Sequence, residues 1–212
     1  MFDLRRARRE EVLSLFERFH GYRSLGRMAV YLFAVYEDGA PVAAFSWQPP
    51  PPGAAVSVCP EAPAGVLALS RMVATPRATR RLRHISKPLR AQMRRLIDRG
   101  RWPVLLTYSD ASLGHTGHVY KCSGWEKTTT AIVPFFENAS GQRQSRYANG
   151  ETGSRGDLLK AGVTTIQRWE HWVCERGRAA EWMSAHGWKR EPIDGKRWAS
   201  GNQAYRWVNT AA

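Results

Sequence analysis

Residues 104–120 read VLLTYSDASLGHTGHVY, and this stretch is the most informative part of the chain. It opens with the apolar run 104–106, which is typical of a buried strand. Asp110, two histidines and Tyr120 then follow within one short segment that glycines punctuate. The sequence therefore places titratable groups at the carboxyl end of a strand, where α/β folds usually bind ligands.

Hydrophobic periodicity predicts several elements before this strand. Residues 7–20 have the spacing of an amphipathic helix. Residues 28–36 and 41–47 are expected to form a β-hairpin, with its turn at residues 37–40. A run of prolines ends the second strand, because proline has no amide donor for the ladder, and a loop is expected over residues 49–64.

Residues 65–108 are predicted to form a β–loop–α–β unit. Its first strand covers residues 65–74, and a basic loop follows at residues 77–87. Ser86 is the expected helix N-cap, with a proline in the first turn, and the helix should stop near Gly100. A connection of this length between neighbouring strands usually makes a right-handed crossover, so the two strands should be parallel.

The C-terminal part of the chain has a different composition. Residues 128–136 read as a strand, and residues 138–157 are polar and glycine-rich, which indicates a long loop. Helical pieces are expected within residues 158–188, and a closing strand at residues 204–208. Six of the nine tryptophans lie in the last quarter of the chain, and most of these six are expected to pack in a small second core, although stacking on bases is the alternative.

Charge points to a polyanionic partner. The 212 residues carry 32 Lys and Arg against 18 Asp and Glu, a net charge of +14, which favours nucleic acid or an anionic membrane. No apolar run reaches the length of a membrane span and no leader is evident, so nucleic acid is the preferred partner. The three cysteines form no paired motif, which fits a reducing cytoplasm.

The basic charge is concentrated in one segment. Between Arg71 and Arg101 there are eleven Lys or Arg and a single acid, which predicts an anion-binding face rather than an ordinary solvated surface. The asymmetry does not distinguish cofactor phosphates from a DNA backbone. The cofactor-binding candidates are Arg77, Arg80, Arg81, Ser86 and Lys87. The DNA-binding candidates are Arg83, Arg90, Arg94, Arg95 and Lys121.

The titratable residues of the opening stretch each have a structural alternative. Asp110 could simply cap a turn after the strand. His115, His118 and Cys122 are spaced so that they could share one face of a helix, which would permit a metal site. A fourth ligand is not evident nearby, and an ordinary hydrogen-bonding pair is the commoner arrangement.

The order of elements resembles the GNAT acyltransferases. In that family the loop and helix after the central strand hold the pyrophosphate of acetyl-CoA, and a tyrosine on the following helix often serves as general acid. Tyr120 occupies the corresponding position, while the family's glycine-containing phosphate loop is missing from residues 77–87. The implied fold class is α/β (α+β): a mixed, largely antiparallel sheet flanked by helices. Residues 1–136 would be the catalytic domain and residues 137–212 a basic, Trp-rich C-terminal elaboration.

A closer resemblance is to the bacteriophage Mom family of DNA-modification proteins, a divergent GNAT branch. Its strand ends Ser-Tyr-Ala-Asp and continues Gly-His-x-Gly-x-x-Tyr, and this chain reads TYSD at 107–110 and GHTGHVY at 114–120, then Trp125. The segment LSRMV at 69–73 resembles the family's Leu-Arg-Arg-Leu-Val, so that Arg71 matches its functional arginine. Looser matches are HGY at 20–22 and YRW at 205–207.

This resemblance implies an enzyme that converts adenine in duplex DNA to N6-carbamoylmethyladenine, which hides phage DNA from host restriction enzymes. The implied partners are double-stranded DNA and a small-molecule donor, in the cytoplasm of a bacterial host and without a membrane. Such an enzyme would hold DNA phosphates on a basic surface, which agrees with the net charge of +14.

The implied chemistry requires that the adenine be flipped, its N6 oriented and a proton removed. Asp110 is expected to accept the N6 proton or bind the amino group, and Tyr120 to act as acid or orienting group. Arg71 would hold an anionic cofactor or stabilise developing charge, and His115 would position Asp110 or its loop. The transferred group is joined through its CH2 carbon, which acetyl transfer does not produce. The sequence therefore leaves two questions open. The donor could be acetyl-CoA, a related acyl donor or a different donor, and a redox metal such as iron could take part.

Two other functions are compatible with the sequence. A GNAT enzyme that acetylates a small amine or a protein predicts acetyl-CoA binding without DNA affinity, and it leaves the charge unexplained. A noncatalytic DNA-binding antirestriction protein predicts a biological effect that survives loss of Asp110 and Tyr120.

Overall fold

Alternating apolar side chains build one eight-stranded sheet in the computed structural model. The structure describes residues 2–21, 23, 25, 29–80, 82–98, 101–111, 114–137, 143–144, 165–175, 179–197 and 203–210. The strand order is β1-β2-β3-β4-β5-β8-β6-β7. Neighbours are antiparallel except for β4 and β5, which run parallel. The strands are β1 (Phe2–Arg6), β2 (Tyr31–Glu37), β3 (Ala40–Gln48), β4 (Val66–Ala74), β5 (Val104–Asp110), β6 (Glu126–Glu137), β7 (Arg143–Gln144) and β8 (Thr165–Glu175).

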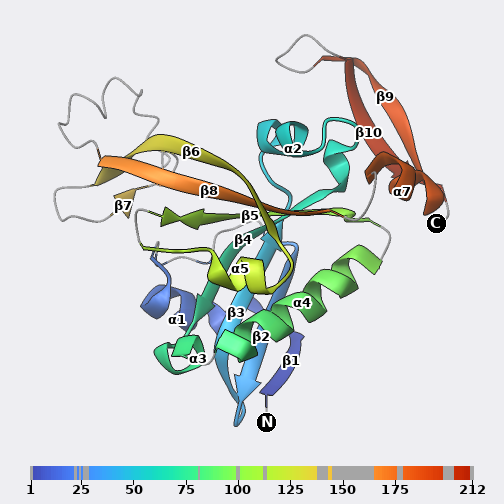
Figure 1. Cartoon of the computed structure of the whole chain (residues 1–212). Helices are drawn as coiled ribbons and strands as arrows, with labels where there is room; N and C mark the ends of the chain where they lie inside the picture. The colour runs from blue at the N-terminus through green and yellow to red at the C-terminus, as the bar shows by residue number, and fades with distance from the viewer. Residues whose placement is uncertain are drawn as a thin grey trace.

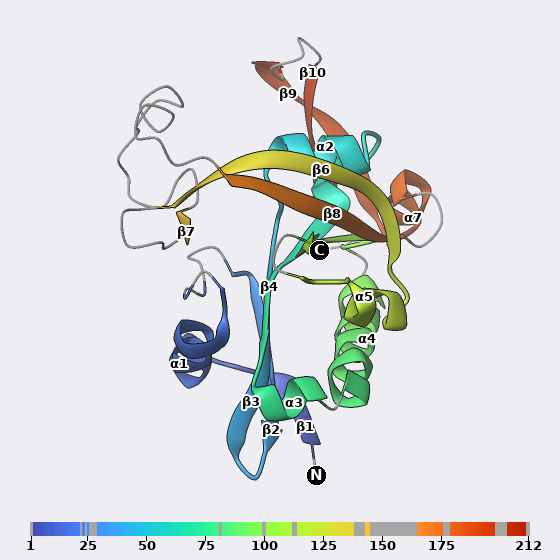
Figure 2. The ribbon, with the colours of Figure 1, turned by 60° about the vertical axis from the view of Figure 1, so that its left-hand side comes forward.

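Helices cover both faces of this sheet, as Figures 1 and 2 show. Helix α1 lies on one face, while α4 and α5 lie on the other (Figure 2). The helices are α1 (Arg9–Phe19), α2 (Pro52–Val58), α3 (Pro76–Arg80), α4 (Leu82–Asp98), α5 (His118–Cys122) and α7 (Ala179–Ala185), with a 3-10 turn η1 (Pro63–Gly65). The predicted fold class, an α/β (α+β) mixed sheet flanked by helices, is confirmed.

The N-terminal half matches the expectations from the sequence. The predicted amphipathic helix is α1, and Val12 and Phe16 bury its apolar stripe. The predicted hairpin is β2–β3, and both turn residues, Asp38 (φ 52°) and Gly39 (φ 81°), adopt the left-handed conformation that two-residue hairpin turns favour. The β–α–β unit is also confirmed, since β4 pairs in parallel with β5.

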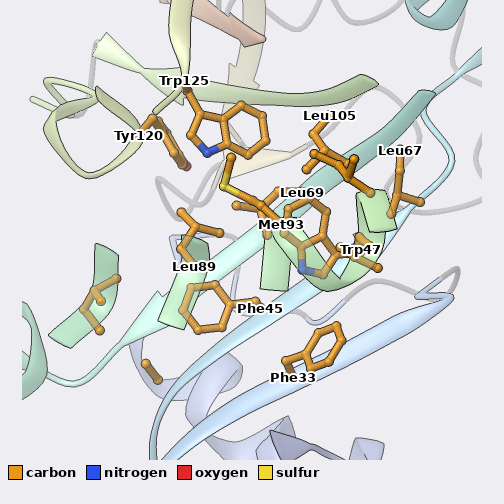
Figure 3. Close-up of a cluster of buried hydrophobic side chains, with 14 of the residues drawn as sticks. Phe33, Phe45, Trp47, Leu67, Leu69, Leu89, Met93, Leu105, Tyr120 and Trp125 are labelled. Carbon is orange, nitrogen blue, oxygen red and sulfur yellow. The ribbon is translucent and has the colours of Figure 1, made fainter. Parts of the chain in front are cut away.

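The main core lies between the sheet and α4. Leu89 and Leu96 of α4 are fully buried against Phe45 and Trp47 of β3 and Leu105 of β5. Figure 3 shows these aromatic and aliphatic side chains closing the space between the helix and the strands. This core fixes α4 beside the end of β5, where the sequence places its titratable residues.

The predicted basic loop at residues 77–87 is wrong, because helices occupy it. Thr75 starts α3, since its hydroxyl accepts from the amide of Ala78 (3.2 Å) and its carbonyl from that of Thr79 (2.9 Å). Helix α4 begins at Leu82, so Ser86 lies inside the helix and is not its N-cap. Burial of Ile85 extends the apolar stripe upstream of Pro88, which the helix accommodates in its interior.

Two further expectations are wrong. The loop predicted over residues 49–64 contains α2 and η1, because Pro52 is tolerated at the first helical position and Ala55 packs inward. Among the described residues of the range 158–188, where helical pieces are predicted, α7 is a helix but Thr165–Glu175 is the strand β8. Pairing with β5 on one side and β6 on the other decides this conformation.

The C-terminal segment contributes to two sheets. Strand β8 lies inside the main sheet, whereas β9 (Trp188–Arg197) and β10 (Gln203–Asn209) form a separate antiparallel ribbon. The strand predicted at residues 204–208 therefore exists as β10, paired with β9. Most of the polar stretch 138–157 lies outside the described residues. The division of the chain at residue 136 stays a prediction. In the described part of the chain, no helix is long and apolar enough to cross a membrane.

Candidate active site

The candidate site lies where β4 and β5 stop pairing. Their parallel ladder runs from Val66 and Val104 to Leu69 and Thr107, and the Thr107 hydroxyl donates to the Leu69 carbonyl (3.0 Å) at its end. Immediately beyond it, β4 has a register shift against β3, and the Ser70 hydroxyl donates to the carbonyl of Ser46 (3.0 Å). A bulge of this kind redirects the side chains that follow it.

The alternation of side chains distributes the candidate residues over the two faces of the sheet. Leu106 and Tyr108 pack in the cluster beneath α2, so Asp110, two residues further along β5, belongs to that face. Tyr120 instead packs in the α4 cluster with Leu105. Asp110 and Tyr120 therefore lie on opposite faces of the sheet, at the same end of β5.

Asp110 is held in a buried position. Its side chain and backbone are only 3 % exposed, and its carbonyl accepts from the amide of His115 (3.3 Å). The loop after it turns sharply through Gly114 (φ 74°) and Gly117 (φ 67°), conformations that favour glycine. This turn returns the chain to the strand end and starts α5 beside it.

Arg71, His115 and His20 are electrostatic neighbours. Burial, together with the positive charges of Arg71 and His115, lowers the pKa of His20 from 6.5 to about 4. His20 follows the last turn of α1, where its amide donates to the Phe16 carbonyl (3.0 Å) and its ring lies 5.8 Å from the Phe16 ring. His20 is therefore neutral at pH 7 and has an imidazole nitrogen that can accept a proton or a hydrogen bond.

Tyr120 retains its proton at neutral pH. Burial raises the pKa of its phenol, and the adjacent Thr107 side chain opposes this only in part. The hydroxyl donates to the carbonyl of Tyr108 over a long distance of 3.5 Å, and the ring meets Trp125 edge to face at 6.0 Å. A protonated phenol at the strand end is suited to donate a proton or a hydrogen bond.

A surface groove of about 700 Å³ borders these residues. The loop after β5, helix α5 and the start of β6 form its walls, and its charged groups include Lys121, Lys127 and Glu126. His115 and Trp125 also line it. The groove thus combines cationic groups with an aromatic wall, and it is large enough for a small molecule or a single nucleobase.

The predicted metal ligands are only partly brought together. His118 and Cys122 are adjacent on α5, with Nε2 and Sγ 3.3 Å apart. His115 lies in the preceding loop and lines the groove. Among the described residues, no three His, Cys, Asp or Glu side chains are grouped closely enough to hold a metal ion.

The predicted cofactor-binding residues do not form a phosphate loop. Arg77 forms an ion pair with Glu37 (3.0 Å), and the Arg80 guanidinium donates to the Pro76 carbonyl (3.4 Å). Ser86 accepts from the Ser123 hydroxyl through its carbonyl (3.4 Å), while Lys87 is exposed on α4. Arg81 lies outside the described residues. The segment 77–87 contains no glycine, and the assignment of these residues to cofactor binding stays a prediction.

Four of the five predicted DNA-binding residues, Arg90, Arg94, Arg95 and Lys121, are exposed, and their role stays a prediction. Arg90, Arg94 and Arg95 project from one face of α4, with the spacing of successive helical turns. The Arg90 guanidinium donates to the Cys122 carbonyl, which joins this face to α5 and exposed Lys121. Arg83 belongs to α4, but its side chain lies outside the described residues. Lys121 leads from this surface into the groove.

Sequence reasoning named His20 and Trp125 only through the family resemblance, and it missed Gln92. His20 entered only through a loose resemblance, and its contact with the strand ends depends on the packing of α1 against the sheet. Gln92 is fully buried in α4 and Trp125 is 3 % exposed behind α5. A polar residue on the apolar stripe of α4 was the available signal for Gln92.

Comparison with known families gives a match to the Mom protein family over residues 1–175. The chain belongs to this family. Comparison with curated proteins gives no match.

Solved structures agree on the fold. The ribosomal-protein-S18-alanine N-acetyltransferase of Escherichia coli superposes with a TM-score of 0.52 at 12 % identity, over 82 % of this chain and 94 % of that one. The IAA acetyltransferase of Bacillus cereus gives 0.52 at 10 % identity, over 83 % and 100 %. Aminoglycoside acetyltransferase AAC(6')-Ib, solved with coenzyme A, gives 0.50 at 14 % identity, over 85 % and 98 %. This member of the Mom family thus has a divergent GNAT-like fold.

Proposed function

We propose that this protein is a DNA-modifying transferase that converts adenine in duplex DNA to N6-carbamoylmethyladenine and so protects phage DNA from restriction. The family match over residues 1–175 carries the proposal. It is supported by Asp110 and Arg71 at the open ends of β5 and β4, beside a groove that leads to a basic surface. The partners are double-stranded DNA and a small-molecule donor, in the cytoplasm of a bacterial host.

DNA binding is assigned to the exposed cations of α4 and α5. Arg90, Arg94, Arg95 and Lys121 would contact phosphates, which carry no sequence information but position the duplex over the groove. Each cation–phosphate contact releases a counterion, so affinity should fall steeply with salt. A flipped adenine would enter the groove beside His115 and Trp125, since its walls already combine an aromatic ring with polar groups.

The transfer would be a displacement at carbon. The N6 lone pair attacks the CH2 carbon of an acetamide that carries a leaving group on that carbon, and the leaving group departs with its bonding pair. Asp110 accepts the N6 proton, and Tyr120, whose raised pKa keeps it protonated, supplies a proton to the leaving group from the other face of the sheet. Arg71 stabilises the developing negative charge, and the neutral imidazole of His20 orients the amino group together with His115.

The deciding experiment is mass spectrometry of nucleosides from DNA of bacteria that express the chain. Wild type should yield an adenosine derivative with the added mass of a carbamoylmethyl group, and Asp110→Asn should not. Asp38→Asn, at the exposed hairpin turn, is the matched control and should modify DNA normally. Unmodified DNA from folded wild-type protein would contradict the proposal.

The fold favours one other function, N-acetylation of a small amine or a protein. That function predicts consumption of acetyl-CoA without DNA, and it gives no role to the basic surface of α4. Salt-dependent DNA binding by the purified protein, lost in Arg94→Ser but retained in Arg18→Ser on exposed α1, would argue against it.

A further inference from the structure

Two buried hydrogen-bond donors near the candidate site have no partner among the described residues. They are Nε2 of Gln92 and Nε1 of Trp125, from side chains that are 0 % and 3 % exposed. A second such indole, that of Trp188, lies apart from them in the cluster beneath α2. Unpaired buried donors are rare in folded proteins, because each leaves the desolvation of an N–H group uncompensated.

Trp47 contacts both of these side chains. Its indole Nε1 donates to Oε1 of Gln92 (2.9 Å), which fixes the amide so that its NH2 group points away from the Trp47 nitrogen. On the other side the Trp125 ring stacks on the Trp47 ring, with centroids 6.3 Å apart and planes inclined by 20°. Figure 3 shows Trp125 beside Tyr120, on the same side of Leu89 and Met93. The donors therefore belong to one packed layer between α4, α5 and β3.

The surroundings specify the acceptor. Leu89, Met93 and Leu105 are buried around this layer, and an apolar environment disfavours an ionised group far more than a neutral one. A neutral carbonyl oxygen, with two lone pairs, can accept from two N–H donors at once. Trp125 also forms part of the groove wall, so a ligand in the groove has a direct approach to it.

We propose that Gln92 and Trp125 form a binding site for the carboxamide oxygen of the group donor. This proposal rests on the proposed function, since the transferred group there ends in a carboxamide. With that oxygen held beneath Trp125, the reacting end of the donor lies next to Tyr120, whose ring touches the same indole. The donor thus binds on the α4 face of the sheet, beside the groove that the flipped adenine enters.

The test is a titration of the whole protein with acetamide, followed by the 15N–1H signal of each tryptophan indole. The Trp125 signal, assigned from its loss in Trp125→Phe, should move progressively and saturate. Trp102→Phe is the matched control: Trp102 is also 3 % exposed, but its indole donates to the Tyr31 hydroxyl (3.2 Å). The Trp102 signal should not respond, and Trp102→Phe should leave the Trp125 response intact.

Sodium acetate is the comparison ligand, and it should shift the Trp125 signal at least tenfold more weakly. Equal or stronger binding of acetate, a uniform drift of all indole signals, or no response of Trp125 would each overturn the assignment. The measurement needs no DNA. A specific acetamide response in a protein that does not modify DNA would therefore uphold this site while contradicting the proposed function.

Discussion

His20 should make the stability of the protein depend on pH. Its pKa is about 4 in the folded chain against an ordinary value of 6.5, because burial and the charges of Arg71 and His115 disfavour the imidazolium ion. The unfolded chain therefore binds more protons than the native one between these values. Stability from the neutral imidazole is fully present above pH 6.5 and is lost as pH falls toward 4.

The magnitude follows from the same two pKa values. Between pH 7 and pH 5, linkage gives a loss of about 2 kcal/mol in the free energy of unfolding, or about 1 to 2 kcal/mol after allowance for partial exposure of the ring. We expect His20→Gln to remove this increment. Urea denaturation at pH 7 and pH 5 measures it, and His186→Gln, at an exposed turn, is the matched control.

The result that refutes this reasoning is also specific. If His20→Gln and the wild-type protein lose the same free energy of unfolding between pH 7 and pH 5, the imidazole is not held neutral by burial and by the charges of Arg71 and His115. If His186→Gln reduced the pH dependence of stability by as much as His20→Gln, the effect could not be assigned to His20.

Three further changes test the packing by denaturation. Gly65→Ala should destabilise by about 1 to 3 kcal/mol, since the new methyl group would lie 2.5 Å from the Met183 sulfur; Gly53→Ala, with nothing within 4 Å, should stay within about 0.5 kcal/mol. Leu89→Ala should cost about 2 to 5 kcal/mol because the side chain is fully buried. Arg77→Ala should cost less than about 1 kcal/mol, since its ion pair is exposed. A loss above 2 kcal/mol in Arg77→Ala, or none in Gly65→Ala, would contradict these assignments.

The sequence predicted the elements whose pattern is local. The hairpin β2–β3 and the strands β4 and β5 follow from short apolar runs and turn residues, and α1 from its helical spacing. The boundary of α4 was misplaced because Pro88 reads as a first-turn residue. A proline inside a helix sacrifices one hydrogen bond, and the buried stripe from Ile85 to Leu96 outweighs that loss.

Strand β8 could not be predicted from its own residues. Ile166, Trp169 and Val173 have the spacing of one helical face, so local periodicity favours a helix. The strand conformation depends on pairing with β5 and β6, which are distant in sequence. Pairing with distant strands therefore outweighs the local preference of these residues for a helix.

The candidate site was predicted as a set of residues on one segment, and its geometry was not. Asp110, His115 and Tyr120 do gather at the end of β5, but alternation along the strand puts Asp110 and Tyr120 on different faces. His20 reaches the site from the first helix, which is a contact that only the three-dimensional packing reveals.

Because β8 pairs with both β5 and β6, the main sheet cannot be completed during synthesis until β8 has been translated. Strand β5 emerges from the ribosome early, yet the partner for its free edge, β8, is translated some fifty residues later. Until then the edges of β5 and β6 that later pair with β8 have unpaired backbone groups, which favours aggregation. The nascent protein therefore has its greatest need of chaperone protection between translation of β6 and arrival of β8.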